Sequence, residues 1–129
     1  MWSTPFDPAG DAILIEVEIF GPMGSRRAWF VLDTGASRTT VNVALVDELG
    51  YGAHVGNRRT RAIGAGGAIH GYSLNLDRID IMGASLAGFE VVCEDVDPET
   101  LVDGLIGLDF LRTRILTIDG VNGQITLGP

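Results

Sequence analysis

The chain has 129 residues, of which 46% are hydrophobic and 20% charged. A chain of this length can bury the core of one domain without disulfides or metal, and we expect that domain to span residues 1–129. Its formal net charge is −8, from 9 basic and 17 acidic residues, which argues against nucleic acid or an anionic membrane as a partner because both select a basic face. The 18 glycines argue against a helical bundle and favour a turn-rich β fold.

The N-terminal residues 1–6 lack the basic start and the apolar run of a signal peptide. No apolar stretch approaches the ~20 residues that cross a membrane. We therefore expect a cytoplasmic protein, or a domain of a longer one, without a membrane partner. The single cysteine, Cys93, excludes an internal disulfide, and its apolar neighbours indicate a small buried side chain rather than a nucleophile.

The first half of the chain begins with two predicted strands. Residues 11–20 alternate apolar and polar side chains, which predicts a half-buried strand. A turn signal at 21–24 precedes the continuous apolar run 28–32, which is typical of a strand covered on both faces. Asn42 is placed to cap a short helix over residues 43–49, and Gly50 is placed to stop it.

The second half reads as short strands separated by glycine turns. The pattern predicts a glycine-rich loop or hairpin tip at 58–72, strands at 74–81 with a bulge at 77–78, at 89–93, at 115–118 and at 124–127, and a second short helix at 108–112. The sum predicts an all-β closed sheet or barrel with one or two short helices in a single lobe.

The sharpest chemical feature is the sequence Asp33-Thr34-Gly35-Ala36-Ser37, which follows the apolar run directly. A carboxylate beside so much apolar surface costs free energy unless it is hydrogen-bonded or serves a purpose. By itself the Asp-Thr-Gly tripeptide is more typical of an aspartate that ends a strand and caps a turn than of a catalytic residue. The segments further along the chain therefore decide between the two interpretations.

Three of those segments occur in a telling order: the glycine loop at 63–69, the sequence Asp-Gly-Leu-Ile-Gly-Leu-Asp-Phe-Leu at 103–111, and a closing pair of strands at 115–119 and 124–127. Together with the Asp-Thr-Gly-Ala-Ser sequence, they resemble the retropepsin-like aspartic proteases, above all the bacterial relatives of retroviral protease. The resemblance runs from about residue 12 to residue 128, and it implies a retropepsin-like barrel.

The resemblance implies a role for each motif residue. Asp33 would be the catalytic carboxylate, Thr34 would tie two catalytic loops together across a dimer, and Gly35 would let the substrate backbone approach closely. The glycine loop would form a flap over the substrate. Contacts with substrate would come from Ala36 and Ser37 in the loop, from Ile63, Gly64, Ala65, Gly66 and Gly67 in the flap, and from Ile106.

Peptide hydrolysis of this kind needs two carboxylates that share a proton. Only one Asp-Thr-Gly is present, and Asp103 and Asp109 lack its loop context. We therefore expect the second carboxylate to be Asp33 of an identical chain, brought close by a two-fold axis. The resulting homodimer would cleave a peptide or protein substrate by water attack, with no metal and no other cofactor.

The chain departs from its relatives at two charged positions. Arg38 follows Ser37 and Asp109 follows Leu108, whereas retroviral proteases place an acid in the loop and an arginine after the later glycine. An Arg38–Asp109 pair would tie the loop to the second helix; alternatively both side chains face solvent. Ala36 resembles the retroviral type rather than pepsin, so we expect a pH optimum less acidic than that of a pepsin.

Two interpretations outside simple catalysis stay open at this point. The same fold without a properly formed dyad would serve as a non-catalytic peptide-binding or dimerisation module. A chain that is monomeric in solution would be active only after self-association. The basic cluster Arg58, Arg59 and Arg61 reads as a solvated arm before the flap, or as a contact for acidic substrate residues.

Overall fold

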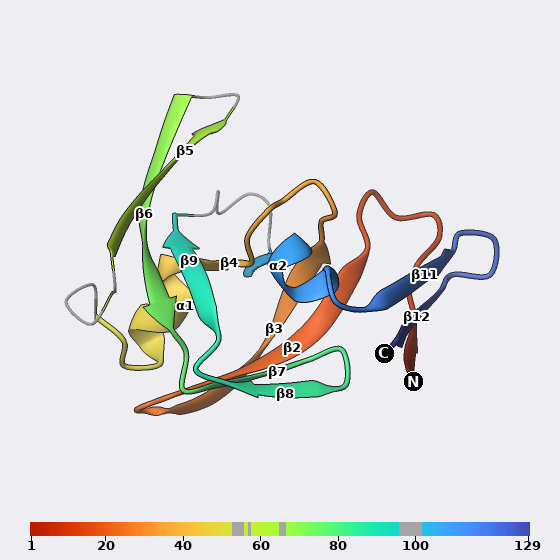
Figure 1. The fold of residues 1–129 in the computed structure, drawn as a ribbon, viewed down its shortest axis with the longest axis horizontal. Coiled ribbons are helices and arrows are strands. Elements are labelled where there is room, and N and C mark those ends of the chain that lie inside the picture. The colour runs from red at the N-terminus through yellow and green to blue at the C-terminus, as the bar shows by residue number, and fades with distance from the viewer. Residues whose placement is uncertain (53–55, 57, 65–66, 96–101) are drawn as a thin grey trace.

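The computed structural model describes residues 1–52, 56, 58–64, 67–95 and 102–129. These residues are mostly in strands, with two short helices (Figure 1). The helices are α1 (Val43–Glu48) and α2 (Leu108–Leu111). The strands are β1 (Trp2–Pro5), β2 (Leu14–Gly21), β3 (Gly24–Leu32), β4 (Thr40–Asn42), β5 (Arg58–Gly64), β6 (Gly67–Asn75), β7 (Arg78–Ile81), β8 (Ala84–Ala87), β9 (Glu90–Glu94), β10 (Gly104–Ile106), β11 (Ile115–Asp119) and β12 (Gln124–Gly128).

The strands form two sheets. The larger has the order β5-β6-β9-β4-β10-β3-β2-β7-β8, and the smaller has the order β1-β12-β11. The predicted all-β class with one or two short helices is confirmed. In the described residues β5 and β8 end the larger order without pairing to each other, so β5 carries a free edge.

The β2–β3 hairpin supplies much of the core. Ile15, Val17 and Ile19 of β2 are at most 2% exposed, which is the face that the alternating pattern predicts. On β3, Phe30 is fully buried but its neighbour Trp29 is 49% exposed. The prediction that this run is covered on both faces is therefore wrong, because no layer in the described residues covers the outer face at Trp29.

Helix α1 begins and ends where the sequence predicts. The Asn42 side-chain oxygen accepts a hydrogen bond from the Ala44 N–H at 3.2 Å. Gly50 has a φ of +93°, a conformation that glycine adopts without strain. Leu45 and Val46 are buried in the core. No helix in the described part of the chain has the length and apolar character needed to cross a membrane.

Strands β5 and β6 pair from Arg58↔Ser73 to Gly64↔Gly67, and the hairpin extends away from the rest of the sheet (Figure 1). The predicted tip lies there, although the strands reach further than the sequence suggested. The predicted bulge at 77–78 is wrong: β6 ends at Asn75 and β7 begins at Arg78. The chain changes partner there, because β6 pairs with β9 whereas β7 pairs with β2.

The smaller sheet joins the two ends of the chain. Strand β1, which the sequence did not reveal, pairs antiparallel with β12, so that Trp2 lies opposite Leu127. The other edge of β12 pairs with β11, after a turn in which Gly123 has a φ of +68°. Both edges of β12 are therefore occupied within one chain.

Candidate active site

Asp33 lies where β3 leaves the sheet. Its backbone N–H donates to the Ile106 carbonyl at 3.0 Å, and its carbonyl accepts from the Ala36 N–H at 3.2 Å. The Gly35 N–H donates to Asp33 Oδ1 at 2.9 Å. Asp33 is half-buried, whereas Thr34 and Gly35 are exposed. The tight turn thus orients the carboxylate through one oxygen and leaves its surface open to a partner.

Strand β10 supports this loop from beside β3. The two strands are parallel, with Gly104 opposite Phe30 and Ile106 opposite Leu32. A Cβ atom on Gly104 would lie 2.2 Å from the Thr40 carbonyl oxygen, so only glycine fits between the strands. Ile106 is fully buried; in this chain its carbonyl supports Asp33 and its side chain belongs to the core.

Asp109 locks the loop to helix α2. Its two oxygens accept from the Thr39 N–H at 2.9 Å, Oδ1 also accepts from the Thr39 hydroxyl at 2.7 Å, and Oδ1 accepts from the Phe110 N–H at 2.9 Å. The predicted ion pair is present, with Arg38 Nε 3.7 Å from Asp109 Oδ2. The sequence did not reveal Thr39, a fully buried hydroxyl residue, because its partner lies 70 residues away.

The two other aspartates of the motif segments are therefore engaged by the chain itself. Asp109 accepts four hydrogen bonds. Asp103 Oδ2 accepts from the Trp29 N–H at 3.1 Å. Asp103 also lies beside Trp29, four residues before Asp33 along the parallel β3–β10 pair. We therefore look outside this chain for the second member of a catalytic pair with Asp33.

A cleft of about 680 Å³ opens beside the loop. Three elements line it: the loop itself, β5 and the β4–β9 pair. The lining residues are Gly35, Ala36, Ser37, Arg38, Thr40, Arg58, Arg59, Thr60, Val92 and Glu94. The cleft thus contains Ala36 and Ser37, two of the residues predicted to contact substrate.

The predicted flap residues lie at the far end of the β5–β6 hairpin. Ile63 and Gly64 are the last residues of β5, paired with residues 68 and 67 of β6. Gly67 has a φ of +112°, which suits glycine at a hairpin tip. Ala65 and Gly66 lie outside the described residues.

The wall of the cleft between β5 and β9 is polar, a feature that sequence reasoning missed. Thr60 Oγ1 is buried, and among the described residues it has no hydrogen-bond partner. A Cβ atom on Gly71 would lie 2.8 Å from Glu94 Cγ, so the Glu94 side chain crosses space that only glycine leaves open. Burial raises the pKa of the Glu94 carboxyl.

The opposite face of the same strands belongs to the core. Cys93 is fully buried, and burial raises the pKa of its thiol to about 12. This confirms the interpretation of Cys93 as a packed side chain, because a reactive cysteine needs a lowered pKa. Tyr72 also packs against the core, and burial raises its pKa to about 12.

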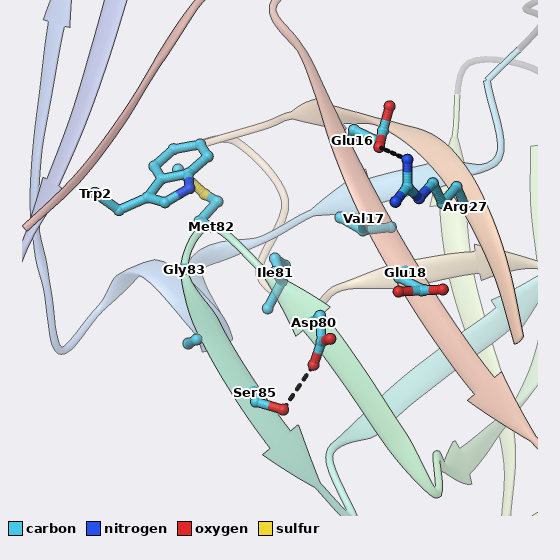
Figure 2. Close-up of a pocket in the computed structure, with 11 residues that line it drawn as sticks. Trp2, Glu16, Val17, Glu18, Arg27, Asp80, Ile81, Met82, Gly83 and Ser85 are labelled. Carbon is cyan, nitrogen blue, oxygen red and sulfur yellow. Dashed lines mark hydrogen bonds and ion pairs between the residues drawn. The ribbon is translucent and has the colours of Figure 1, made fainter.

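A second pocket, of about 420 Å³, lies between β2, β3, β7 and β8 (Figure 2). It contains no residue of the Asp33 loop. Trp2 lies over Met82 at one end, and at the other Asp80 accepts from the Ser85 hydroxyl at 2.6 Å (Figure 2). Arg27 lies 3.7 Å from Glu16. Glu18 accepts from the Ser25 hydroxyl, and Asp80 also accepts from Arg78. Each charged side chain of this pocket thus has a partner in its own chain.

Comparisons with known proteins agree with this geometry. A family model described as aspartyl protease matches residues 15–110. The structure is similar to a retropepsin-like aspartic protease from Rickettsia conorii, with a TM-score of 0.69 and 16% identity over 95% of this chain and 94% of that chain. It is also similar to EIAV protease solved with the inhibitor HBY-793, with a TM-score of 0.59 and 20% identity over 81% of this chain and 89% of that chain. A search among curated proteins finds no match. The expected retropepsin-like fold is therefore confirmed.

Proposed function

Because the chain belongs to the aspartyl protease family, whose model matches residues 15–110, we propose that it is an endopeptidase whose two catalytic carboxylates are Asp33 and its copy in a homodimer. One observation carries this proposal. The Asp33 carboxylate is held by the Gly35 N–H at 2.9 Å on a loop whose Thr34 and Gly35 are exposed. A fixed carboxylate on an open loop is suited to chemistry with a partner.

The dyad would act on a water molecule. One Asp33 takes a proton from the water as the water oxygen bonds to the carbonyl carbon of the substrate, while the other Asp33, protonated, donates a hydrogen bond to the carbonyl oxygen. The proton then passes to the leaving nitrogen as the peptide bond breaks. The bond from Gly35 to Oδ1 leaves Oδ2 for the water or the second carboxylate.

The need for a second copy follows from the other acids of the site. Asp103 and Asp109 already accept hydrogen bonds from Trp29 and Thr39. A two-fold axis beside Thr34 would bring the two exposed loops together and supply the missing carboxylate. We expect the Thr34 side chains to join the loops in that interface.

A peptide is the substrate that suits this cleft. Strand β5 ends the larger sheet, so an extended chain can add to its free edge by main-chain hydrogen bonds. Ala36 and Ser37 face the same cleft from the loop. The residues of the predicted flap, Ile63, Gly64, Ala65, Gly66 and Gly67, would close over the bound chain.

The test is cleavage of a diverse peptide library at roughly pH 3 to 8 by the native chain and by Asp33→Asn. We expect cleavage by the native chain alone. Mixing the two chains in equal amounts, with time to exchange, tests the dimer. A shared dyad leaves about a quarter of the native activity per total chain, whereas independent active sites leave about half.

Two results would overturn the proposal. A dimeric native chain that cleaves none of the peptides would move the interpretation to the peptide-binding module. Cleavage that persists in Asp33→Asn, in equally pure samples, would show that the Asp33 carboxylate is not catalytic.

A further inference from the structure

The cleft beside the Asp33 loop is basic, although the whole chain is acidic. Its charged lining consists of three arginines, Arg38, Arg58 and Arg59, against one carboxylate, Glu94. The chain as a whole has a formal net charge of −8. Positive charge is thus concentrated at the place where the substrate is proposed to bind.

Two of these arginines converge on one glutamate. Arg38 Nη2 lies 2.6 Å from Glu90 Oε1, and Arg58 Nη2 lies 4.0 Å from the same oxygen. Arg38 reaches from the Asp33 loop and Arg58 from β5, so they approach from opposite sides of the cleft. Asp109 also pairs with Arg38, but each guanidinium has five N–H donors, so donors remain beyond these ion pairs.

The strand register places Arg58 on the cleft side. Arg58 pairs with Ser73 of β6, Ser73 with Val92 of β9, and Val92 with Thr40 of β4. Paired residues share one face of a sheet, and both Val92 and Thr40 line the cleft. Arg59 falls in the next row with Tyr72, which packs against the core.

Arg58 is also the less constrained of the two. Its side chain is 66% exposed, and its contact with Glu90 is at the long limit of an ion pair. Arg38 is 33% exposed and is held by both Glu90 and Asp109. Arg58 can therefore move onto a ligand, while Arg38 presents its remaining donors from a fixed position.

We propose that Arg38 and Arg58 form a subsite that selects an aspartate or glutamate side chain of the substrate. The inference rests on the proposed function and adds to it the chemical class of one substrate residue. Guanidinium groups bind carboxylates through paired, charge-assisted hydrogen bonds. The site lies beside the loop, so the acidic residue would occupy a position close to the cut.

The test uses peptides that the native chain cleaves, with glutamate, glutamine or lysine placed in turn at each position around the cut. Near neutral pH we expect kcat/KM to favour glutamate over glutamine by about five- to tenfold at one position. Salt from roughly 0.05 to 0.5 M should shrink that ratio, because an exposed ion pair is screened.

Variants of Arg58 separate a direct contact from a structural effect. Arg58→Gln should reduce the preference to about twofold, and Arg58→Glu should invert it, so that lysine becomes the favoured residue. Arg27→Gln is the matched control. Arg27 is 75% exposed and pairs with Glu16, so its substitution removes the same charge far from the loop. Equal ratios for the native chain, Arg58→Glu and Arg27→Gln would overturn the subsite.

Binding to the Asp33→Asn chain distinguishes the two proposals. If the native chain cleaves nothing but Asp33→Asn binds glutamate peptides more tightly than glutamine peptides, the protease proposal fails and the subsite stands. If cleavage occurs without any preference for glutamate, the subsite fails and the protease stands. If there is neither cleavage nor selective binding, both are overturned.

Discussion

The carboxylates beside two hollows of the molecule are hydrogen-bonded in different ways. In the pocket of Figure 2, Asp80 accepts from Arg78 at 2.9 Å and from Ser85 at 2.6 Å, and these bonds hold its pKa below the ordinary range. In the Asp33 loop, the Asp33 carboxylate accepts one hydrogen bond, from the Gly35 N–H. Glu94 has a pKa raised by burial alone.

The difference separates structural carboxylates from those available for chemistry. An aspartate whose oxygens are filled by its own chain is stabilised as an anion and has little capacity left for a ligand. An aspartate that is oriented but not saturated can bind water, share a proton or meet a second carboxylate. The volumes of the two hollows do not reveal this difference, whereas the hydrogen bonds of their carboxylates do.

The largest expected effect compares the two aspartates directly. Asp33→Asn should lower kcat/KM by at least about 10³-fold, because the shared proton is lost. Asp80→Asn should leave kcat/KM unchanged, because Asp80 bonds to Arg78 and Ser85 and lines a pocket that contains no residue of the Asp33 loop. A loss of similar size in both variants, measured on one peptide at one pH, would remove the distinction between the hollows.

Asp109 provides the next largest effect, on stability. Asp109→Ala leaves the buried Thr39 hydroxyl and the Thr39 backbone N–H without their acceptor, and should lower the free energy of unfolding by about 2–4 kcal/mol. Asp109→Asn keeps one acceptor oxygen and should cost about half as much. Urea unfolding at a fixed chain concentration measures both, since dimerisation adds to apparent stability.

Asp80→Ala is the control for Asp109, because its partners lie at the surface and their loss should cost less than about 1 kcal/mol. Equal costs at Asp80 and Asp109 would show that Asp109 does not lock the loop.

The backbone contact behind the loop predicts a smaller effect. A Cβ atom on Gly107 would lie 2.6 Å from the Arg38 carbonyl carbon. Gly107→Ala should therefore lower the free energy of unfolding by about 1–3 kcal/mol and reduce kcat by displacing the loop. Gly120→Ala is the control, because a Cβ atom there meets nothing within 4 Å. A fully active Gly107→Ala would mean that the loop tolerates the shift.

The sequence predicted local features well because their signals are local. The alternation in β2, the Asn42 cap of α1 and the run that delivers Asp33 all depend on neighbours within a few residues. Strand β1 was not predicted because its partner is β12, at the other end of the chain. The bulge at 77–78 was inferred from a phase slip that in fact marks a change of partner strand.

The site was predictable in its motif and not in its surroundings. Asp33, Thr34 and Gly35 stand together in the chain, so a resemblance could point to them. The contact of Arg38 with Glu90 joins residues 52 positions apart, and nothing in a single sequence records which residues meet across a sheet. The polar wall that includes Glu94 depends on the same long-range register.

The smallest expected effect is on the pH dependence of stability, which should have opposite signs for Glu94 and Asp80. Burial raises the folded-state pKa of Glu94 above its ordinary 4.5. The stability associated with the neutral carboxyl is therefore fully present below pH 4.5 and is lost as pH rises through the raised pKa. Hydrogen bonds lower the folded-state pKa of Asp80 below 3.8, so its contribution is present above that value and is lost as pH falls. Over the range from roughly pH 2 to 7, Glu94→Gln should therefore gain stability relative to the native chain as pH rises above 4.5, whereas Asp80→Asn should lose stability relative to it as pH rises toward 3.8. Urea midpoints of the three proteins across this range measure both slopes. Slopes of the same sign would mean that the two carboxyls have similar environments, and the contrast between the hollows would then have no electrostatic basis.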